Sequence, residues 1–318
     1  MNWAQAIEPT EIIAAQQRIE RFIFRTPLVP AEEWSDELGI ELRFKAENLQ
    51  HVGAFKSRGA TNAVMALTAE EAIRGVVTHS SGNHAAALAR AATLRGIPVH
   101  VVMPENSSAV KLAAVRAWGV DPVLCPPTPE DRQRVADEIA RETGATLIHP
   151  FDNRQVVAGQ GTVGLEIVEQ WPQVQDIVVP VGGGGLLAGV LIAVKTRNPA
   201  VRVFGAEPAW ADDAWRSLRS NRLESPTRLD TVADGLRTGL GQLTFPIIRS
   251  LVDDILLVTE EAIIPTATEL LRRVRLLAEP SGAVATAAVC EHAERFAGRR
   301  VAVVISGGNT DPFAWHGR

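Results

Sequence analysis

One lysine segment and three polar or glycine-rich segments are the parts of this chain whose residue types could do chemistry. Lys56 stands in segment 53–60, GAFKSRGA, which opens an apolar helical pattern that continues through Val64 and Leu67. A desolvated lysine amine loses its charge more readily and then acts as a nucleophile or a base. A lysine at a helix start can also be a plain solvated residue, so this segment alone leaves both interpretations open.

The second segment lies between a predicted strand and the helix that follows it, and it consists of Ser80, Ser81, Gly82, Asn83 and His84. Backbone amides at the start of a helix are oriented to bind anions such as a carboxylate. Serine and asparagine are also common at helix starts, where they cap free amides. A binding loop and a plain helix cap are therefore both compatible with this segment.

Four consecutive glycines, Gly182, Gly183, Gly184 and Gly185, form the third segment, which follows a predicted buried strand and precedes a helix. Backbone without side chains can close around a phosphate. A bare turn built from four glycines would cost considerable chain entropy, so a phosphate site is favoured. The fourth segment, 306–309 with the sequence SGGN, also ends a strand, but by itself it indicates little.

The glycine segment also permits a different chemistry. Residues 183–188, GGGLLA, fit the pattern G-x-G-x-x-A of a dinucleotide-binding loop, and Glu207 ends the next strand about where a ribose-binding acid belongs. A nicotinamide dehydrogenase is therefore an alternative function. It gives no role to Lys56 or to segment 80–84.

These segments need a scaffold of alternating strands and helices to position them. Short β-branched runs predict eight strands, at 76–78, 99–103, 122–124, 146–149, 177–181, 201–204, 255–258 and 301–305. Helical patterns between the first four begin near Asn83, Ser108 and Thr128. The alternation predicts an α/β fold with two parallel sheets, and the proline and Asp/Asn cluster at 149–152 predicts the boundary between them. Two facing sheets would leave a cleft for a small ligand.

Composition narrows the class of protein. The 318 residues are 46% hydrophobic and 22% charged, with a formal net charge of −5, which is typical of a globular protein with two structural units. Scattered rather than clustered basic residues argue against a nucleic-acid partner. The apolar stretches are too short to cross a membrane, and the first residues lack a basic region before an apolar one, so we expect a cytoplasmic protein. Cys125 and Cys290 lack metal-ligand spacing and are expected to be packing residues.

Taken in order, the segments resemble the serine/threonine dehydratase and serine racemase branch of the fold-type II pyridoxal-5′-phosphate enzymes, which are tryptophan synthase β-like. The resemblance covers nearly the whole chain and rests on segments 55–60, 80–84, 158–162, 180–185, 206–208, 233–235, 279–283 and 306–309. It implies two domains, each an open, twisted, mostly parallel sheet flanked by helices. Residues 1–50 and 151–318 would form the large cofactor-binding domain and residues 51–150 the small one. A homodimer is common among such relatives.

The resemblance also assigns roles around the cofactor. It implies that Lys56 holds pyridoxal 5′-phosphate as a Schiff base, that Phe55 packs on the pyridine ring and that Asn83 bonds the ring hydroxyl oxygen. Amides of Gly182 to Gly185 would hold the phosphate, and Ser306 would face the pyridine nitrogen. A serine hydroxyl does not stabilise a full positive charge there, so the ring is expected to favour prompt loss of a β-substituent over transamination.

The implied activity is loss of water and then ammonia from a β-hydroxy amino acid such as L-threonine or L-serine, giving a 2-oxo acid. Segment 80–84 would bind the substrate carboxylate, and Ser81 matches the acid/base of racemase-like members. A serine or hydroxyaspartate racemase with dehydratase side activity, or a dehydratase of 3-hydroxyaspartate or phenylserine, is the alternative. Phe151, where animal racemases carry asparagine, favours a dehydratase. Ala85 and Ala86 stand where relatives carry Gly-Gln or Ala-Gln, which predicts a less polar wall beside the substrate.

A metal site is also implied. Segment 207–213, EPAWADD, resembles the racemase segment that binds Mg²⁺ or Ca²⁺, with Glu207, Asp213 and the carbonyl of Ala211 as ligands. Oxygen donors with water completing the shell suit these cations, although acidic residues on a loop are more often merely solvated. Arg132 and Thr238 match positions near the substrate site of the racemases.

Overall fold

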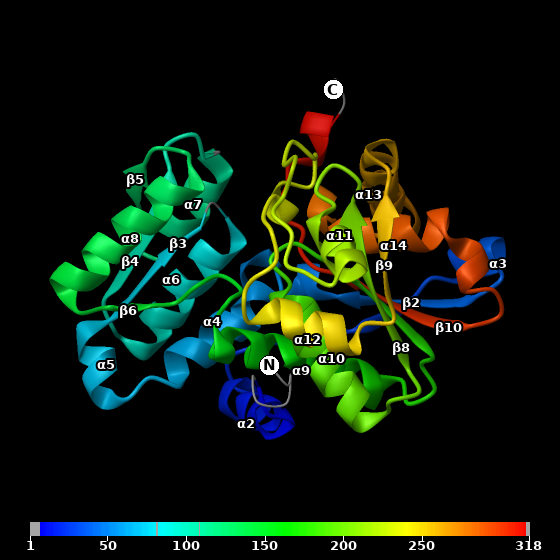
Figure 1. Ribbon diagram of the computed structural model, residues 1–318, viewed down its shortest axis with the longest axis horizontal. Helices are drawn as coiled ribbons and strands as arrows, with labels where there is room; N and C mark the ends of the chain where they lie inside the picture. Colours follow the sequence, from blue (N-terminus) through cyan, green and yellow to red (C-terminus); the bar gives the residue numbers. More distant parts are fainter. Residues whose placement is uncertain (1–6, 81, 108, 316–318) are drawn as a thin grey trace.

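Two sheets organise the part of the chain that the computed structural model describes, residues 7–80, 82–107 and 109–315 (Figure 1). The six-stranded sheet has the order β1-β2-β10-β7-β8-β9, and the four-stranded sheet has the order β5-β4-β3-β6. Their strands are β1 (Leu28–Pro30), β2 (Glu41–Ala46), β3 (Val76–His79), β4 (Val99–Pro104), β5 (Val123–Cys125), β6 (Thr146–Leu147), β7 (Asp176–Pro180), β8 (Arg202–Pro208), β9 (Asp254–Val258) and β10 (Arg300–Ile305). Every pair of neighbours is parallel except β1 with β2. The predicted α/β fold is confirmed.

Helices connect the strands and cover the sheets. They are α2 (Pro9–Ile19), α3 (Glu32–Leu38), α4 (Lys56–Met65), α5 (Ala69–Arg74), α6 (Asn83–Arg95), α7 (Ala109–Arg116), α8 (Pro129–Thr143), α9 (Arg154–Gln170), α10 (Gly185–Arg197), α11 (Asp213–Ser220), α12 (Thr244–Leu251), α13 (Glu260–Val274) and α14 (Pro280–Glu291). Side-chain caps explain some of the starts: the Thr128 hydroxyl accepts a hydrogen bond from the amide of Asp131 at 3.1 Å and begins α8. Helices α6, α7 and α8 begin where the sequence pattern predicts.

Both faces of the six-stranded sheet are buried, which explains its nearly continuous apolar strands. Along β7, Ile177 and Val179 pack into one hydrophobic core and Val178 packs into another on the opposite face. Strand β10 repeats this alternation with Ala302 and Val303. Successive side chains of a strand point to opposite faces, so a strand covered on both sides needs apolar residues at every position.

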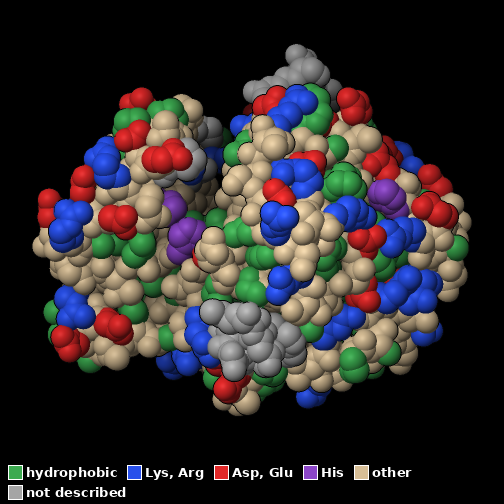
Figure 2. All heavy atoms as spheres, in the orientation of Figure 1, with side chains coloured by type: hydrophobic (Ala, Val, Ile, Leu, Met, Phe, Trp, Pro, Cys, Tyr) green, Lys and Arg blue, Asp and Glu red, His purple; other side chains and the backbone are tan. Residues whose placement is uncertain are grey.

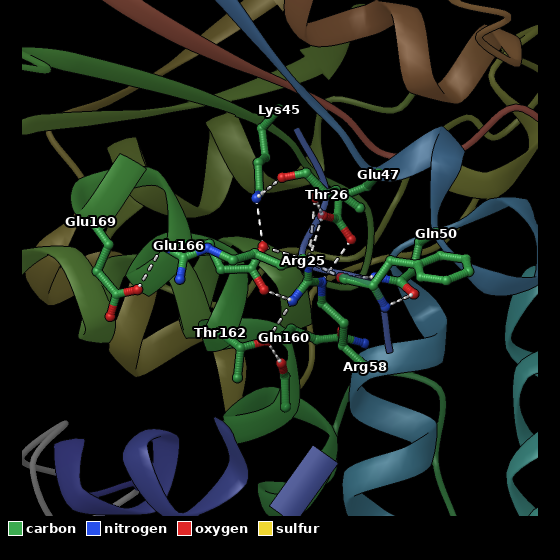
Figure 3. A network of polar contacts seen from close by, with 12 residues as sticks. Arg25, Thr26, Lys45, Glu47, Gln50, Arg58, Gln160, Thr162, Glu166 and Glu169 are labelled. Carbon is green, nitrogen blue, oxygen red and sulfur yellow. Dashed lines mark hydrogen bonds and ion pairs between the residues drawn. The ribbon is translucent and has the colours of Figure 1, made fainter. Parts of the chain in front are cut away.

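A buried network of charged side chains joins α4 to the larger sheet (Figure 3). Arg58 donates to both oxygens of Glu47 at 2.7 and 2.8 Å, and to both oxygens of Glu166 at 2.6 and 2.9 Å. Lys45 of β2 donates to Glu166 at 2.5 Å and to the carbonyl of Thr26 at 2.8 Å. The two cations of this network balance its two carboxylates, so the network has no net charge. An unpaired charge would be costly here, because the site is buried away from water.

Helices α4 and α9 bring their backbones close together at Gly59 and Gly159. A Cβ on Gly159 would lie 2.7 Å from the carbonyl oxygen of Arg58 and 2.7 Å from the Cα of Gly59. Glycine is therefore required at this crossing, which fixes the first turn of α4 against the large sheet's helices.

No helix in the described ranges is both long and apolar enough to span a bilayer. The division into residues 51–150 and the remainder stays a prediction, as do the homodimer and the cytoplasmic location.

Candidate active site

A cleft of about 520 Å³ lies between the two sheets, within the range usual for small-molecule sites. Figure 2 shows the molecule hollowed between its left and right parts, with histidine side chains beside the hollow. The cleft is lined by most of the predicted site residues, namely Phe55, Lys56, Ser80, Gly82, Asn83, His84, Gly182, Gly183, Gly184, Gly185 and Ser306. Thr238 and Arg132 also line it. Ser81, predicted as an acid/base, lies outside the described residues.

Lys56 is the first residue of α4, and its amine lies inside the cleft. The Nζ donates a hydrogen bond to the carbonyl of Pro150 at 2.8 Å and lies 5.2 Å from the centroid of the Phe55 ring. Burial lowers the pKa of Lys56 to about 8 because the charged ammonium is poorly solvated there. A lysine with this pKa is neutral in about a tenth of molecules at pH 7, far more than at its ordinary pKa, and the neutral form is the one that acts as a nucleophile or base.

The chain just before Lys56 is held by the last strand end. The amide of Phe55 donates to the carbonyl of Ser306 at 3.0 Å, and the amide of Gly308 donates to the carbonyl of Gly53 at 2.9 Å. These bonds bring segment 306–309 against segment 53–55, which the sequence alone does not indicate. Ser306 and Lys56 consequently line the same cleft.

The glycine segment forms a loop without side chains at the start of α10. Gly184 has a φ of +82°, which favours glycine, and a Cβ on Gly183 would lie 2.2 Å from the Cγ of Phe151. The Thr244 hydroxyl donates to the carbonyl of Gly183 at 2.8 Å and fixes the loop. A glycine loop before a helix of 13 residues suits a phosphate, so the residues here fit the phosphate end of pyridoxal phosphate.

Three histidines stand beside the cleft. Burial lowers the pKa of His79, His84 and His149, the last to about 3, and charges on neighbouring histidines and Lys56 lower the pKa of His84 and His149 further. The Nδ1 of His149 accepts hydrogen bonds from the amides of Phe151 and Asp152 at 3.4 and 3.0 Å. These imidazoles are therefore neutral at neutral pH.

Three carboxylates that line the cleft had no predicted role, namely Glu130, Asp234 and Glu279. Glu279 accepts a hydrogen bond from Asn83 Nδ2 at 2.7 Å, and Asp234 forms an ion pair with Lys111 across the cleft. Burial, followed by repulsion from Asp234, raises the pKa of Glu279 to about 7. Glu279 and Asp234 stand in segments that carried the family resemblance, whereas Lys111 is a single lysine on a helix and gives no signal in the sequence.

Ala85 and Ala86 do not form a wall beside the substrate. Both are buried in the core between α6, β4 and α7, against Met103 and Val115, and neither lines the cleft. The prediction of a less polar substrate wall is therefore wrong, because these positions point to the inner face of α6.

The implied metal ligands lie apart from the cleft lining. Glu207 is almost fully buried, and its two oxygens accept hydrogen bonds from the amides of Ala214 and Trp215, each at 2.9 Å. Asp213 Oδ2 accepts from the amide of Leu240 at 3.0 Å, while its buried Oδ1 has no hydrogen-bond partner among the described residues. Burial, followed by the charge of Asp213, raises the pKa of Glu207.

This geometry decides against the nicotinamide alternative. Glu207 is almost fully buried and does not line the cleft, so this carboxylate is not placed to bind a ribose there. The described residues contain no group of three or more His, Cys, Asp or Glu arranged around a metal. A cation at Glu207 and Asp213 would therefore need a backbone carbonyl and water.

Comparisons with known proteins agree with the fold. A family described as "Pyridoxal-phosphate dependent enzyme" matches residues 19–307. The chain is 44% identical to a serine racemase of Dictyostelium discoideum, covering 95% of this chain and 94% of that protein. It is 40% identical to a beta-hydroxyaspartate dehydratase of Paracoccus denitrificans, covering 95% and 96%. The solved structure of a T.th. threonine deaminase superimposes with a TM-score of 0.90 at 44% identity, covering 95% and 98%.

Proposed function

The chain belongs to the pyridoxal-phosphate dependent enzyme family, and on this premise we propose that it removes water and then ammonia from a β-hydroxy amino acid such as L-threonine or L-serine. The products would be a 2-oxo acid and ammonia. Relatives named as hydroxyaspartate dehydratase and threonine deaminase support an elimination of this kind. The single observation that carries the proposal is the position of the half-buried Lys56, whose amine lies in the same cleft as the glycine loop and has a pKa lowered by burial to about 8.

When bound, the cofactor supplies an electron sink that makes the α proton of an amino acid acidic. The Lys56 amine lies in the cleft and would be the group that takes this proton. The carbonyl of Pro150 orients the amine, at 2.8 Å. The histidines beside Lys56 are neutral, so no positive charge on them opposes the protonation of its amine.

The remaining residues bind and orient the ligands. Amides of Gly182 to Gly185 would hold the phosphate, Asn83 would bond the ring hydroxyl oxygen, and Ser306 would face the pyridine nitrogen; all of these residues line the cleft. Segment 80–84 would bind the substrate carboxylate through amides and hydroxyls at the start of α6.

A second candidate function is racemisation of serine or hydroxyaspartate, with elimination as a side activity. Its support is that several relatives are named serine racemase, at 42–44% identity. Racemisation needs a second acid/base on the face of the substrate opposite Lys56, and Ser81 is the sequence candidate for that role.

A divalent cation, Mg²⁺ or Ca²⁺, is proposed at Glu207, Asp213 and the carbonyl of Ala211. The buried Oδ1 of Asp213, which has no hydrogen-bond partner in the described ranges, supports it. Because the charge of Asp213 raises the pKa of the buried Glu207, a cation there would relieve a destabilising arrangement.

The test is the absorbance of the purified protein with pyridoxal phosphate, followed by product assays with L-threonine, L-serine and threo-3-hydroxyaspartate. We expect a band near about 410 nm from lysine-bound cofactor, its loss in Lys56→Ala, and release of 2-oxo acid. Lys195→Ala is the matched control, since Lys195 lies at the end of α10 and pairs with Asp253. No band in the folded wild-type protein refutes the cofactor site; inversion of serine without oxo acid would establish the racemase instead.

A further inference from the structure

A chain of side-chain amides runs behind Asn83. Asn309 uses the two hydrogens of its Nδ2 to donate to the carbonyl of Val52 at 2.6 Å and to the Oδ1 of Asn83 at 2.8 Å. Asn83 in turn donates from its own Nδ2 to Glu279 Oε1 at 2.7 Å. Asn83 and Glu279 line the cleft, whereas Asn309 lies behind them and does not.

This chain distinguishes the two ends of the Asn83 amide. If the amide were rotated by half a turn, its Nδ2 would face the Nδ2 of Asn309, and its Oδ1 would face the carboxylate of Glu279. The first contact would then join two donors, and the second would join two acceptors, so neither could be a hydrogen bond. In the observed orientation, one hydrogen of Asn83 Nδ2 is used by Glu279, and the other remains for a ligand in the cleft.

The two anchors of Asn83 differ in one property. Glu279 can ionise, and burial raises its pKa to about 7, with Asp234 raising it further and both Asn83 and Lys111 lowering it. Once protonated, Glu279 can donate to an oxygen as well as accept from a nitrogen, so it no longer distinguishes the two ends of the amide. Asn309 does not ionise, and its own orientation is fixed by the carbonyl of Val52.

The backbone is shaped to admit Asn309. Gly53 has a φ of +68°, and a Cβ at this position would lie 2.4 Å from the Oδ1 of Asn309. The amide of Gly308 donates to the carbonyl of Gly53 at 2.9 Å, which brings the two segments together. A glycine three residues before Lys56 thus leaves the space that Asn309 occupies.

We propose that Asn309 is a positioning residue, which holds the amide of Asn83 so that an N–H, and not the oxygen, is directed to the ring hydroxyl oxygen of the cofactor. This proposal rests on the proposed function, since it presumes pyridoxal phosphate in the cleft. Asn309 itself does not touch the cofactor in this arrangement. Its contribution is that the orientation of Asn83 stays the same whether Glu279 is ionised or protonated.

The experiment compares Asn309→Ala and Asn309→Asp, with Asn48→Ala as control. Asn48 is a neighbouring half-buried amide that donates to the carbonyl of Leu277 at 3.0 Å and is not hydrogen-bonded to Asn83. Each apoprotein is titrated with pyridoxal phosphate, and the absorbance of the bound cofactor is recorded from about pH 6 to pH 9, across the pKa of Glu279. Cofactor affinity and absorbance are thus measured independently of turnover.

In Asn309→Ala, we expect the wild-type spectrum above pH 7 and a changed spectrum below it, with cofactor affinity about tenfold weaker at the acid end. The wild-type protein and Asn48→Ala should keep one spectrum across this range. Asn309→Asp should be the more affected variant at every pH, because a carboxylate attracts the Nδ2 of Asn83 and so favours the rotated amide. A role in packing alone predicts the reverse, since aspartate has the shape of asparagine.

If Asn309→Ala does not fold, Gly53→Ala displaces the same side chain without removing it and should show the same dependence on pH. Spectra of both variants that match wild type at all pH values would overturn the positioning role. A wild-type protein that takes up no cofactor would instead overturn the proposed function, so the two failures are distinguishable.

Discussion

Replacing Arg58 by methionine should be among the most damaging single changes outside the cleft. The side chains of Arg58 and Glu47 are fully buried, and that of Glu166 is almost so. Without Arg58, the network of Lys45, Glu47 and Glu166 passes from neutral to a charge of −1. Glu47 then keeps one side-chain hydrogen bond, from the hydroxyl of Thr26 at 2.5 Å. Removing one partner of a buried ion pair costs roughly 3–5 kcal/mol, because the other charge stays in a poorly solvated site.

The loss should depend on pH in a direction that the network fixes. In the native protein, Arg58 and Lys45 keep the pKa of Glu47 below its ordinary value in spite of burial. In Arg58→Met, burial dominates and raises this pKa, so the folded protein takes up a proton that the unfolded chain does not bind. A carboxyl group whose pKa is higher in the folded protein than in the unfolded chain stabilises the folded protein at pH values below the unfolded pKa. This contribution to stability is lost as the pH rises. The variant should therefore be closer to wild type at pH 5 than at pH 8.

Urea unfolding followed by tryptophan fluorescence at these two pH values, with saturating cofactor in every sample, measures this effect. Arg58→Met with Glu47→Gln should recover more than about 1 kcal/mol, since the unpaired buried charge is gone. Arg74→Met is the control, because its ion pair with Glu70 is exposed and should contribute little. A loss below about 1 kcal/mol in Arg58→Met, or no recovery in the double variant, would refute the reasoning.

Three further predictions concern the cleft and the cation. The rate at which the apoprotein takes up pyridoxal phosphate should rise with pH and reach half its maximum near the Lys56 pKa of about 8. Stopped-flow absorbance measures this rate, and a rate independent of pH would contradict the prediction. Gly183→Ala should weaken cofactor binding by at least about tenfold, since its Cβ would lie 2.2 Å from Phe151, whereas Gly39→Ala, with nothing within 4 Å, should not. Adding Ca²⁺ should raise the melting temperature of wild type but not of Asp213→Asn, and equal shifts would exclude a cation at this carboxylate.

The strands that could be predicted from the sequence are those built from short apolar, β-branched runs. Strands β7 and β10 consist almost entirely of apolar residues, because helices cover both sides of the sheet. The sequence pattern does not predict strand β2, since its residues ELRFKA carry charges that suggest an exposed segment. One of these charges, Lys45, is buried and paired with Glu166, which is distant in the sequence. A strand stabilised by such a pair gives no local signal.

In the candidate site, too, some features have a local sequence signal and others depend on distant contacts. Lys56 and the glycines from Gly182 to Gly185 could be found because backbone conformation and one reactive side chain determine their chemistry. The orientation of Glu279 could not, because it begins α14 without capping it and turns its carboxylate to Asn83 instead. Contacts between segments nearly 200 residues apart follow from the packing of the two sheets and not from local patterns.

The three histidines explain why Lys56 can change charge freely during a reaction. Burial alone accounts for the lowered pKa of Lys56, without repulsion from a second cation. If His149 or His84 were protonated near neutral pH, each change in the charge of Lys56 would shift the protonation of its neighbours as well. Because burial keeps both imidazoles neutral, the amine can release and accept a proton while the surrounding charges stay constant. In the proposed reaction, Lys56 would therefore be the group that carries the α proton on this side of the cleft, and a second acid or base for racemisation would have to come from the opposite side.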